Sequence, residues 1–426
     1  PSAGRGRGGA RPVPGPMNRR ALGLHWDIEP GLTFLNHGSF GLAPRELLAW
    51  RFAQLEAIER DPVAFLAAEF QPRLDLARQV LADLVGAAAG QLAFVPSTTY
   101  GLNELLQRLE LPAGSEVLLP DHGYNATVNL VRFACERRGW SCRLVPLPLP
   151  LLDPAQVVEA FAAAWSPATR LLVVDHITSP TALVLPLERL IGLARQRGAR
   201  ILVDGAHGPG SVPLQLQAWQ PDGYVGNLHK WLCCPRGSAF LWVRDPWQRS
   251  LRPLVVGHGA NGPLPPGASR FHLEHDWLGT ADPTPWLALP EALRLLTGMA
   301  VAAASPGPWR SRLAQLQDGH HALAQHGQRL LLQAVQEGLG SAPHPLAPPS
   351  MAPGCRPSSS GWASSCRYFP CGPTRQGCRS VCASPVSLTP PTTTCSAWRR
   401  PCRQRFRRRV PDRLRDRLRD RLGAQG

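Results

Sequence analysis

Lys230 is the residue whose type most directly suggests chemistry, because it is the single lysine among 426 residues. The sequence holds 46 lysine and arginine residues, so the other 45 basic side chains are arginines. Arginine keeps its proton at physiological pH, whereas burial can bring a lysine amine towards neutrality and let it attack a carbonyl carbon. One lysine among arginines therefore indicates amine chemistry; the alternative is a chance remainder of an arginine-rich composition.

Two further segments place polar groups where chemistry is expected. The apolar segment 201–203 ends in Asp204, and His207 follows three residues later. A carboxylate at the end of a buried strand is costly unless it meets a cation. The segment 97–99 places hydroxyl and backbone N–H groups at the start of an expected helix, which suits a phosphate. The alternative for Asp204 and for 97–99 is an ordinary helix N-cap.

Together these groups match the needs of pyridoxal 5′-phosphate. This cofactor requires a lysine for an imine, a carboxylate for its protonated ring nitrogen and a cup for its phosphate. Lys230, Asp204 and the segment 97–99 supply one of each. The sequence therefore predicts a pyridoxal-phosphate site at the ends of separate strands.

Short apolar segments alternate with helical patterns through the middle of the chain. This alternation predicts an α/β fold with a mainly parallel sheet between helices, whose ligands bind at the carboxyl ends of the strands. The seven expected strands are 92–95, 116–120, 142–147, 170–176, 200–204, 223–225 and 239–243. The expected helices are 43–60, 72–87, 99–109, 126–138, 154–165, 187–197, 286–296 and 310–339.

The charge of +16 lies at the two ends of the chain. Residues 1–20 contribute +5 and residues 341–426 contribute +13, which leaves −2 for residues 21–340. Specific nucleic-acid binding is therefore not expected of the central part. The sequence has no apolar segment long enough to cross a membrane and no signal peptide, so we expect a cytoplasmic protein. No histidine lies among the seven cysteines between 355 and 402, so a metal site is not predicted there.

Seven motifs carry a resemblance to a known family: LNHGSFG (35–41), STTYGLN (97–103), DHGYNA (121–126), DHITSPTALVLPL (175–187), VDGAHGPG (203–210), GNLHKW (226–231) and WLGTAD (277–282). Over roughly residues 26–351 the chain resembles the class V aminotransferases of the pyridoxal-phosphate-dependent fold type I. Within that family it looks like the isopenicillin N epimerase-like branch. The resemblance implies a large cofactor-binding domain followed by a small C-terminal α/β domain.

The resemblance also implies roles for individual residues. Lys230 would form the internal aldimine, Asp204 would pair with the pyridine nitrogen, and His207 would bind the side of the ring that carries the hydroxyl. The implied catalytic residues are these three. The implied cofactor-binding residues are Lys230, Asp204, His207, Thr98, Thr99, Tyr124, His229, Thr280, Ser179 and Asn227.

Among these residues, Tyr124 would stack on the ring, and Thr98 and Thr99 would hold the phosphate through backbone N–H and hydroxyl groups. Thr280 resembles the residue that such dimers contribute to the phosphate of the partner subunit, so a homodimer is implied. Asn36 and His37 would line the substrate entrance; their alternative is a turn with a packed histidine.

The implied reaction begins when an amino acid displaces Lys230 and forms an external aldimine, after which the freed lysine removes the α-proton. Racemisation, transamination and elimination then remain open. A cysteine or cystine C–S lyase, or a cysteine desulfurase, is the competing enzyme, although Cys233 and Cys234 follow Lys230 too closely to be a mobile nucleophile. A chain that binds the cofactor but lacks its closing domain and is impaired in catalysis is the second alternative.

The expected organisation has four parts. Residues 1–20 form a disordered extension, 21–300 a large cofactor-binding domain, 301–351 a linker helix with the start of the small domain, and 352–426 an atypical, largely disordered tail rich in Cys, Pro and Arg. The tail lacks the periodicity of a small domain that would supply an arginine for the substrate carboxylate. We therefore hypothesise that it is an out-of-frame translation of that domain.

Overall fold

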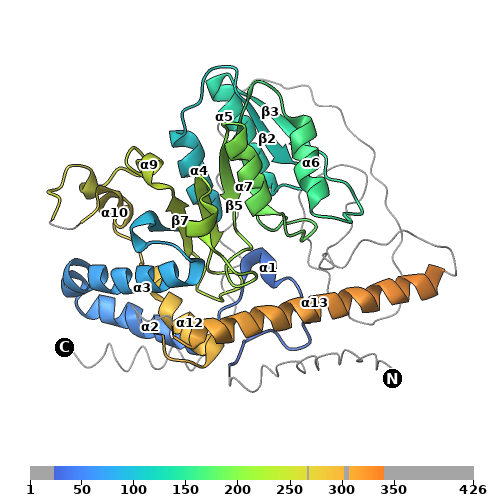
Figure 1. The fold of residues 1–426 in the computed structure, drawn as a ribbon. Coiled ribbons are helices and arrows are strands. Elements are labelled where there is room, and N and C mark those ends of the chain that lie inside the picture. Colours follow the sequence, from blue (N-terminus) through green and yellow to red (C-terminus); the bar gives the residue numbers. More distant parts are fainter. Residues whose placement is uncertain (1–23, 266–267, 302–306, 340–426) are drawn as a thin grey trace, which may run out of the picture. The chain divides into compact units, whose positions relative to one another are not determined.

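A seven-stranded sheet organises the protein, and its strands lie in the order β1-β7-β6-β5-β4-β2-β3 (Figure 1). The computed structural model describes residues 24–265, 268–301 and 307–339. The predicted extension 1–20 and tail 352–426 lie outside the described residues, as does most of the predicted segment 301–351. The strands are β1 (Leu92–Val95), β2 (Glu116–Pro120), β3 (Ser141–Val145), β4 (Thr169–Asp175), β5 (Arg200–Asp204), β6 (Gly223–Asn227) and β7 (Ala239–Val243).

The sheet confirms the predicted mainly parallel topology. The pairs β2–β3, β2–β4, β4–β5 and β5–β6 are parallel, and β7 runs antiparallel to both of its neighbours, β1 and β6. All strand limits lie within two residues of the prediction. β3 ends at Val145 rather than 147, because Pro146 has no backbone N–H to donate. β6 extends to Asn227 rather than 225, because its pairing with β7 continues to Ala239.

The helices also match the prediction within two residues, except that the helix expected at 286–296 is divided in two. The longer helices are α2 (Arg45–Arg60), α3 (Phe70–Val85), α4 (Thr98–Arg108), α5 (Asn125–Arg138), α6 (Ala155–Ala164), α7 (Leu187–Gln196), α12 (Leu289–Thr297) and α13 (Trp309–Leu339). The shorter helices are α1 (His37–Phe40), α8 (Leu216–Trp219), α9 (Asp245–Gln248), α10 (Arg270–His275) and α11 (Thr284–Leu287). Helix α12 starts separately from α11 with Pro290 in its first turn, where a missing N–H costs no helical hydrogen bond.

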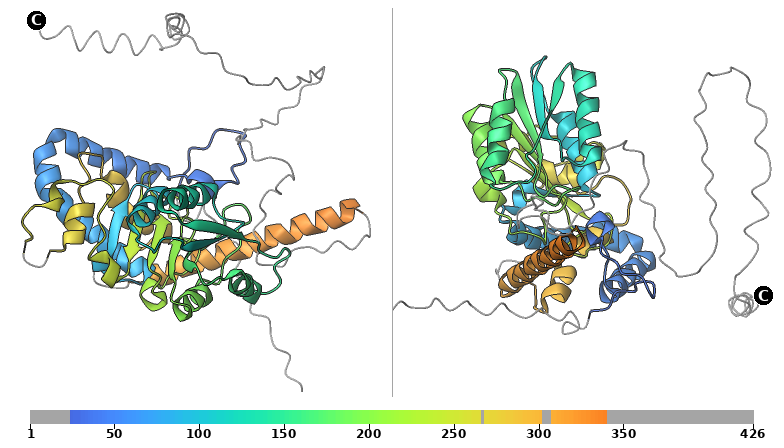
Figure 2. Two further views of the ribbon diagram at one scale, coloured as in Figure 1. Left: turned by 90° about the horizontal axis from the view of Figure 1, so that it is seen from above. Right: turned by 90° about the vertical axis from the view of Figure 1, so that its right-hand side faces the viewer.

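Helices cover both faces of the sheet, as Figure 2 shows, and each face has its own apolar core. One core joins α3, α6, α7 and α12 to the sheet, and the other joins α4 and α5 to it. Side chains along β4 alternate between the two, with Leu172 and Val174 in the first and Leu171 and Val173 in the second. Successive side chains of a strand point to opposite faces of the sheet. The last residue of a strand therefore points to the same face as the residues two and four positions before it.

No helix in the described ranges combines the length and the apolar character that crossing a membrane requires.

Candidate active site

The carboxyl ends of three neighbouring parallel strands bring together the residues on which the prediction depends. β4 ends in Asp175, β5 in Asp204 and β6 in Asn227, and Lys230 follows β6 by three residues. The loop after β5 carries His207, whose Nε2 lies 3.1 Å from Lys230 Nζ. The structure therefore brings Lys230 and His207 into contact at this edge of the sheet, close to Asp204.

Burial changes the protonation of both partners. It lowers the pKa of Lys230 to about 8, against the opposing attraction of Asp204 and Asp175. It also lowers the pKa of His207 to about 3, and the nearby Lys230 contributes in the same direction. His207 is therefore neutral near pH 7, and its Nε2 can accept a hydrogen bond from the amine. Lys230 can lose its proton near physiological pH, which a nucleophilic or basic amine needs.

Asp204, whose charge acts on Lys230, is 3% exposed. Its Oδ2 accepts a hydrogen bond of 2.6 Å from the Thr127 hydroxyl, and its Oδ1 accepts one of 3.1 Å from the Ala206 N–H. Burial raises the pKa of Asp204, while the Thr127 hydroxyl, the Ala206 N–H and the charge of Lys230 lower it. Asp204 forms no ion pair with another of the described residues, so this buried carboxylate is suited to a cation supplied from outside the chain.

The motif at 35–41 packs directly on the lysine segment. Gly41 has φ +71°, and a Cβ placed on it would lie 1.7 Å from the carbonyl oxygen of His229. His37 Nε2 donates a hydrogen bond of 2.8 Å to the carbonyl oxygen of Lys230. The structure thus gives His37 a role in holding the backbone of Lys230, while Asn36 beside it is exposed. Their predicted place at a substrate entrance stays a prediction.

The phosphate segment differs in detail from the expectation. Ser97 is the N-cap of α4, because its Oγ accepts the Tyr100 N–H at 3.1 Å. The Thr98 N–H, expected to face a phosphate, donates instead to Asn227 Oδ1 at 3.0 Å, because α4 packs against β6, whose last residue, Asn227, is buried there. The Thr98 hydroxyl oxygen is buried and has no hydrogen-bond partner in the described structure. The groups of this segment that could still bind a phosphate are this unpartnered hydroxyl and the exposed Thr99.

His229 directly precedes Lys230 in sequence, and no hydrogen bond within the described residues involves its Nε2 atom. Its Nδ1 donates to the Ser238 carbonyl oxygen at 2.8 Å, and burial lowers the pKa of the ring. The Nε2 atom is then the acceptor of a neutral imidazole.

Three of the remaining predicted residues lie at the surface. Tyr124 is the N-cap residue of α5 with a side chain 44% exposed, Ser179 lies in an exposed turn, and Thr280 lies in an exposed loop. No hydrogen bond within the described residues joins their side chains to Lys230. The contribution of Thr280 would require a second copy of the chain.

Sequence reasoning missed two residues of this region, Thr127 and Asp175. Thr127 lies inside α5, and only the packing of α5 on the sheet brings its hydroxyl to Asp204. Asp175 carried a usable signal, because β4 ends in an aspartate after an apolar run just as β5 does.

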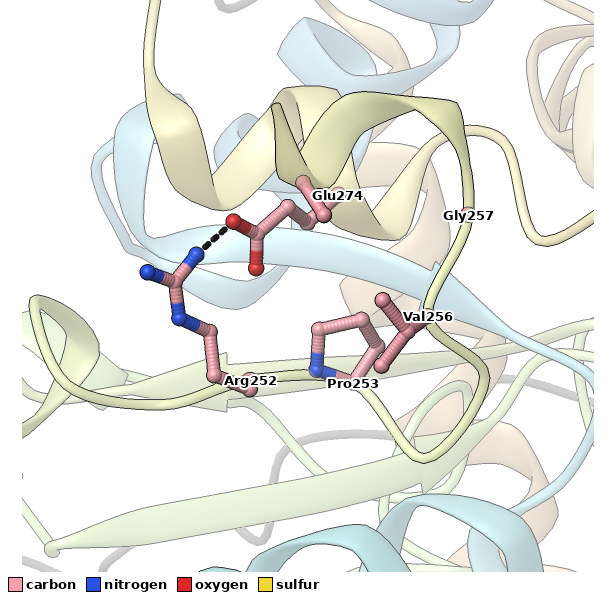
Figure 3. Close-up of a pocket in the computed structure, with 6 residues that line it drawn as sticks. Arg252, Pro253, Val256, Gly257 and Glu274 are labelled. Atoms are coloured by element: carbon pink, nitrogen blue, oxygen red, sulfur yellow. Dashed lines mark ion pairs between the residues drawn. The ribbon is translucent and has the colours of Figure 1, made fainter. Parts of the chain in front are cut away.

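A separate pocket of 210 Å³ is lined by Arg252, Pro253, Val256, Gly257, Ala260 and Glu274, and none of the predicted site residues lines it (Figure 3). The guanidinium of Arg252 forms an ion pair with Glu274. Because the cation of this pocket is already neutralised, the pocket is a poor receptor for a phosphate. Among residues 24–265, 268–301 and 307–339, no cluster of three or more His, Cys, Asp or Glu side chains is arranged to hold a metal ion.

The protein is similar to several known proteins. The sequence profile of the family Aminotransferase class-V matches residues 56–310. The isopenicillin N epimerase of Amycolatopsis lactamdurans is 37% identical over 287 residues, which are 64% of this chain and 71% of the relative. Putative L-cysteine desulfhydrase 1 of Oryza sativa subsp. japonica is 31% identical over 282 residues, which are 62% of this chain and 57% of that protein.

A solved structure of C-DES, in a variant with glycine covalently linked to the PLP cofactor, has a TM-score of 0.61 at 23% identity. The match covers 76% of this chain and 82% of that structure, and it shows a shared fold. The residues at the strand ends also fit the cofactor. An amine with a lowered pKa, a buried carboxylate without an ion pair and a buried unpartnered hydroxyl are the groups that its aldehyde, ring nitrogen and phosphate need. The chain therefore belongs to the class-V aminotransferase family of pyridoxal-5′-phosphate-dependent enzymes and, within it, resembles the isopenicillin N epimerases.

Proposed function

We propose that this protein moves the α-proton of an amino acid, as an epimerase or racemase does, with Lys230 as the base. One observation carries the proposal: Lys230 Nζ lies 3.1 Å from a neutral His207, and burial lowers the pKa of the lysine to about 8. A base with a pKa near the working pH is the most effective at proton transfer.

The residues that would hold the cofactor are Lys230 at its aldehyde, Asp204 at its ring nitrogen, and Thr98 and Thr99 at its phosphate. The bound cofactor supplies an electron sink for the charge that remains when the α-proton leaves. Asp204 supports this sink by keeping the ring nitrogen protonated, and Thr127 and Ala206 fix the carboxylate in place.

Lys230 would act as the base once its amine is no longer bonded to the cofactor. The Nζ atom takes the α-proton and can return it, and His207 Nε2 accepts a hydrogen bond from the amine and orients it. His37 holds the same residue at its backbone oxygen. The backbone of Lys230 is therefore held in place while its side chain moves, so that Nζ can both remove and return the α-proton.

We also propose a homodimer, because the family resemblance implies that Thr280 serves the cofactor of a second copy, and Thr280 is exposed and has no hydrogen bond to the site residues in the described part of the chain. Transamination uses the same first proton transfer and differs in where the proton returns.

A C–S lyase acting on cysteine or cystine is the second candidate, supported by the 31% identity to a putative cysteine desulfhydrase. A desulfurase is less well supported. Cys233 and Cys234 are buried, and burial raises the pKa of Cys234. Burial keeps both thiols from a substrate, and the raised pKa also makes Cys234 a weak nucleophile, so neither is suited to take sulfur from a substrate.

The proposal is tested first by trapping the cofactor. Purified protein is loaded with pyridoxal phosphate, reduced with borohydride and digested, and the masses of the peptides are measured by mass spectrometry. Because the chain has a single lysine, the label should fall on the peptide that contains Lys230, and K230A should carry none. Absorbance retained by K230A after reduction and denaturation would overturn the assignment.

The reaction is tested by incubating the loaded protein with single amino acids in deuterated water. Proton transfer predicts deuterium at the α-carbon, with loss of chirality for an epimerase and a keto acid for a transaminase. Sulfide and pyruvate from cysteine or cystine would identify the lyase. Cofactor bound at Lys230 without exchange for any amino acid would refute the proposed activity and favour the catalytically impaired chain.

A further inference from the structure

Two carboxylates end adjacent parallel strands at the same register. Asp175 is the Cα partner of Asp204 in the pairing of β4 with β5. Asp175 shares the parity of Leu171 and Val173, and Asp204 shares that of Leu202, and these three residues belong to the core under α4 and α5. Both carboxylates therefore point to one face, on strands about 4.8 Å apart.

Both side chains are 3% exposed. Two buried carboxylates this close together do not both ionise, because each charge opposes the other and neither is hydrated. One of them must hold a proton at neutral pH.

Hydrogen bonding decides which of the two is charged. Asp204 accepts two hydrogen bonds, from the Thr127 hydroxyl at 2.6 Å and the Ala206 N–H at 3.1 Å. Asp175 accepts a longer bond, of 3.3 Å, from the Tyr124 N–H, and its other donor is only its own backbone N–H. Donors stabilise the ionised form, so the negative charge belongs on Asp204 and the proton on Asp175.

The other charged or titratable groups around Asp175 do not reverse this order. From the strand on its other side, Asp121 accepts the Leu147 N–H, and His122 Nδ1 contacts the Thr181 hydroxyl. His176, next in sequence, is bonded to the Tyr224 hydroxyl. Lys230 attracts both carboxylates. Burial, followed by the charge of Asp204, raises the pKa of Asp175 well above its ordinary value.

We propose that Asp175 is a positioning residue that holds a proton beside Asp204, so that the floor of the cofactor site carries a single negative charge. The inference rests on the proposed role of Asp204 towards the cofactor. Asp175 keeps that charge on the one carboxylate that Thr127 and Ala206 orient.

Infrared spectroscopy tests the proton directly, with or without cofactor. Wild-type protein at neutral pH should show the carbonyl stretch of a buried protonated carboxylic acid, and D175N should lack that band. The control is D222N, which changes another buried aspartate at the amino end of β6, where Asp222 is ion-paired with Arg244. D222N should keep the band. Its absence from wild-type protein, or its survival in D175N, would overturn the proposal.

Cofactor affinity is the second measurement. D175N replaces one neutral group by another, so its affinity for pyridoxal phosphate should stay within about threefold of wild type. D204N removes the charge that faces the ring nitrogen and should weaken binding by roughly tenfold or more. Equal losses in D175N and D204N would contradict the division of roles. If wild-type protein bound no cofactor, the proposed function would fail, whereas the infrared band would still decide the proton on Asp175.

Discussion

Replacing Gly41 by alanine should separate the motif at 35–41 from the lysine segment. Gly41 adopts φ +71° and ψ 162°, a region that is essentially restricted to glycine and that alanine enters at a cost of about 1–3 kcal/mol. The new Cβ would lie 1.7 Å from the carbonyl oxygen of His229 and 3.1 Å from the Cα of Lys230. Both are backbone atoms, so the contact is relieved only by moving the segment that carries the lysine.

The expected magnitude follows from these two terms. Overpacking that forces a backbone shift costs typically about 1–3 kcal/mol, which brings the total for G41A to about 2–6 kcal/mol of unfolding free energy. Gly31 provides the matched control, because it has φ +85° in the same N-terminal region and its Cβ would meet nothing within 4 Å. G31A should therefore lose only the conformational term of about 1–2 kcal/mol.

Denaturant unfolding of the two variants, monitored by tryptophan fluorescence, measures this difference. Cofactor affinity adds a second readout, since G41A should weaken binding by displacing Lys230 while G31A should leave it unchanged. The reasoning is refuted if the two variants unfold at the same denaturant concentration and bind the cofactor equally. That result would mean that the motif does not support the lysine segment.

The remaining predictions concern pH and a buried ion pair. Burial lowers the pKa of His176 to about 4, so between pH 6.5 and pH 4 the unfolded chain binds a proton at this residue and the native state does not. Acidification from pH 6.5 to 4 should therefore lower the free energy of unfolding by about 3 kcal/mol. In denaturant titrations, H176Q should show a weaker dependence of stability on pH. R78A should lose about 3–5 kcal/mol because it leaves the buried Asp276 without its ion-pair partner, whereas R45A, from an exposed and solvent-screened pair, should leave stability almost unchanged in the same assay. Cofactor capture by unloaded protein should accelerate as pH rises through about 8, the pKa of Lys230, and then level off; a rate independent of pH in stopped-flow absorbance would contradict this.

Much of this site follows from the sequence because polar residues that end apolar strands stand out. Asp204 follows an apolar run, and Lys230 lies shortly after the next strand. The sequence alone therefore predicts that both lie at the carboxyl ends of neighbouring strands. Thr127 could not be recognised, because a threonine inside a helix has no sequence feature that reveals the side chain it will meet. The bond from Thr98 N–H to Asn227 was equally hidden, since it depends on how the first turn of α4 packs against β6, which lies far away in sequence.

The charges around Lys230 explain why an amine, and not a guanidinium, is needed there. In the unloaded site, burial favours the neutral amine while Asp204 attracts its proton, and the two effects leave the pKa of Lys230 at about 8. If Asp175 holds a proton and His207 is neutral, Asp204 is the only negative charge in this part of the site. On the proposed assignment, Asp204 exchanges its attraction to Lys230 for an ion pair with a protonated ring nitrogen, which lets the amine remain neutral and act as a base. An arginine would stay charged at this position and would compete with the ring nitrogen for Asp204.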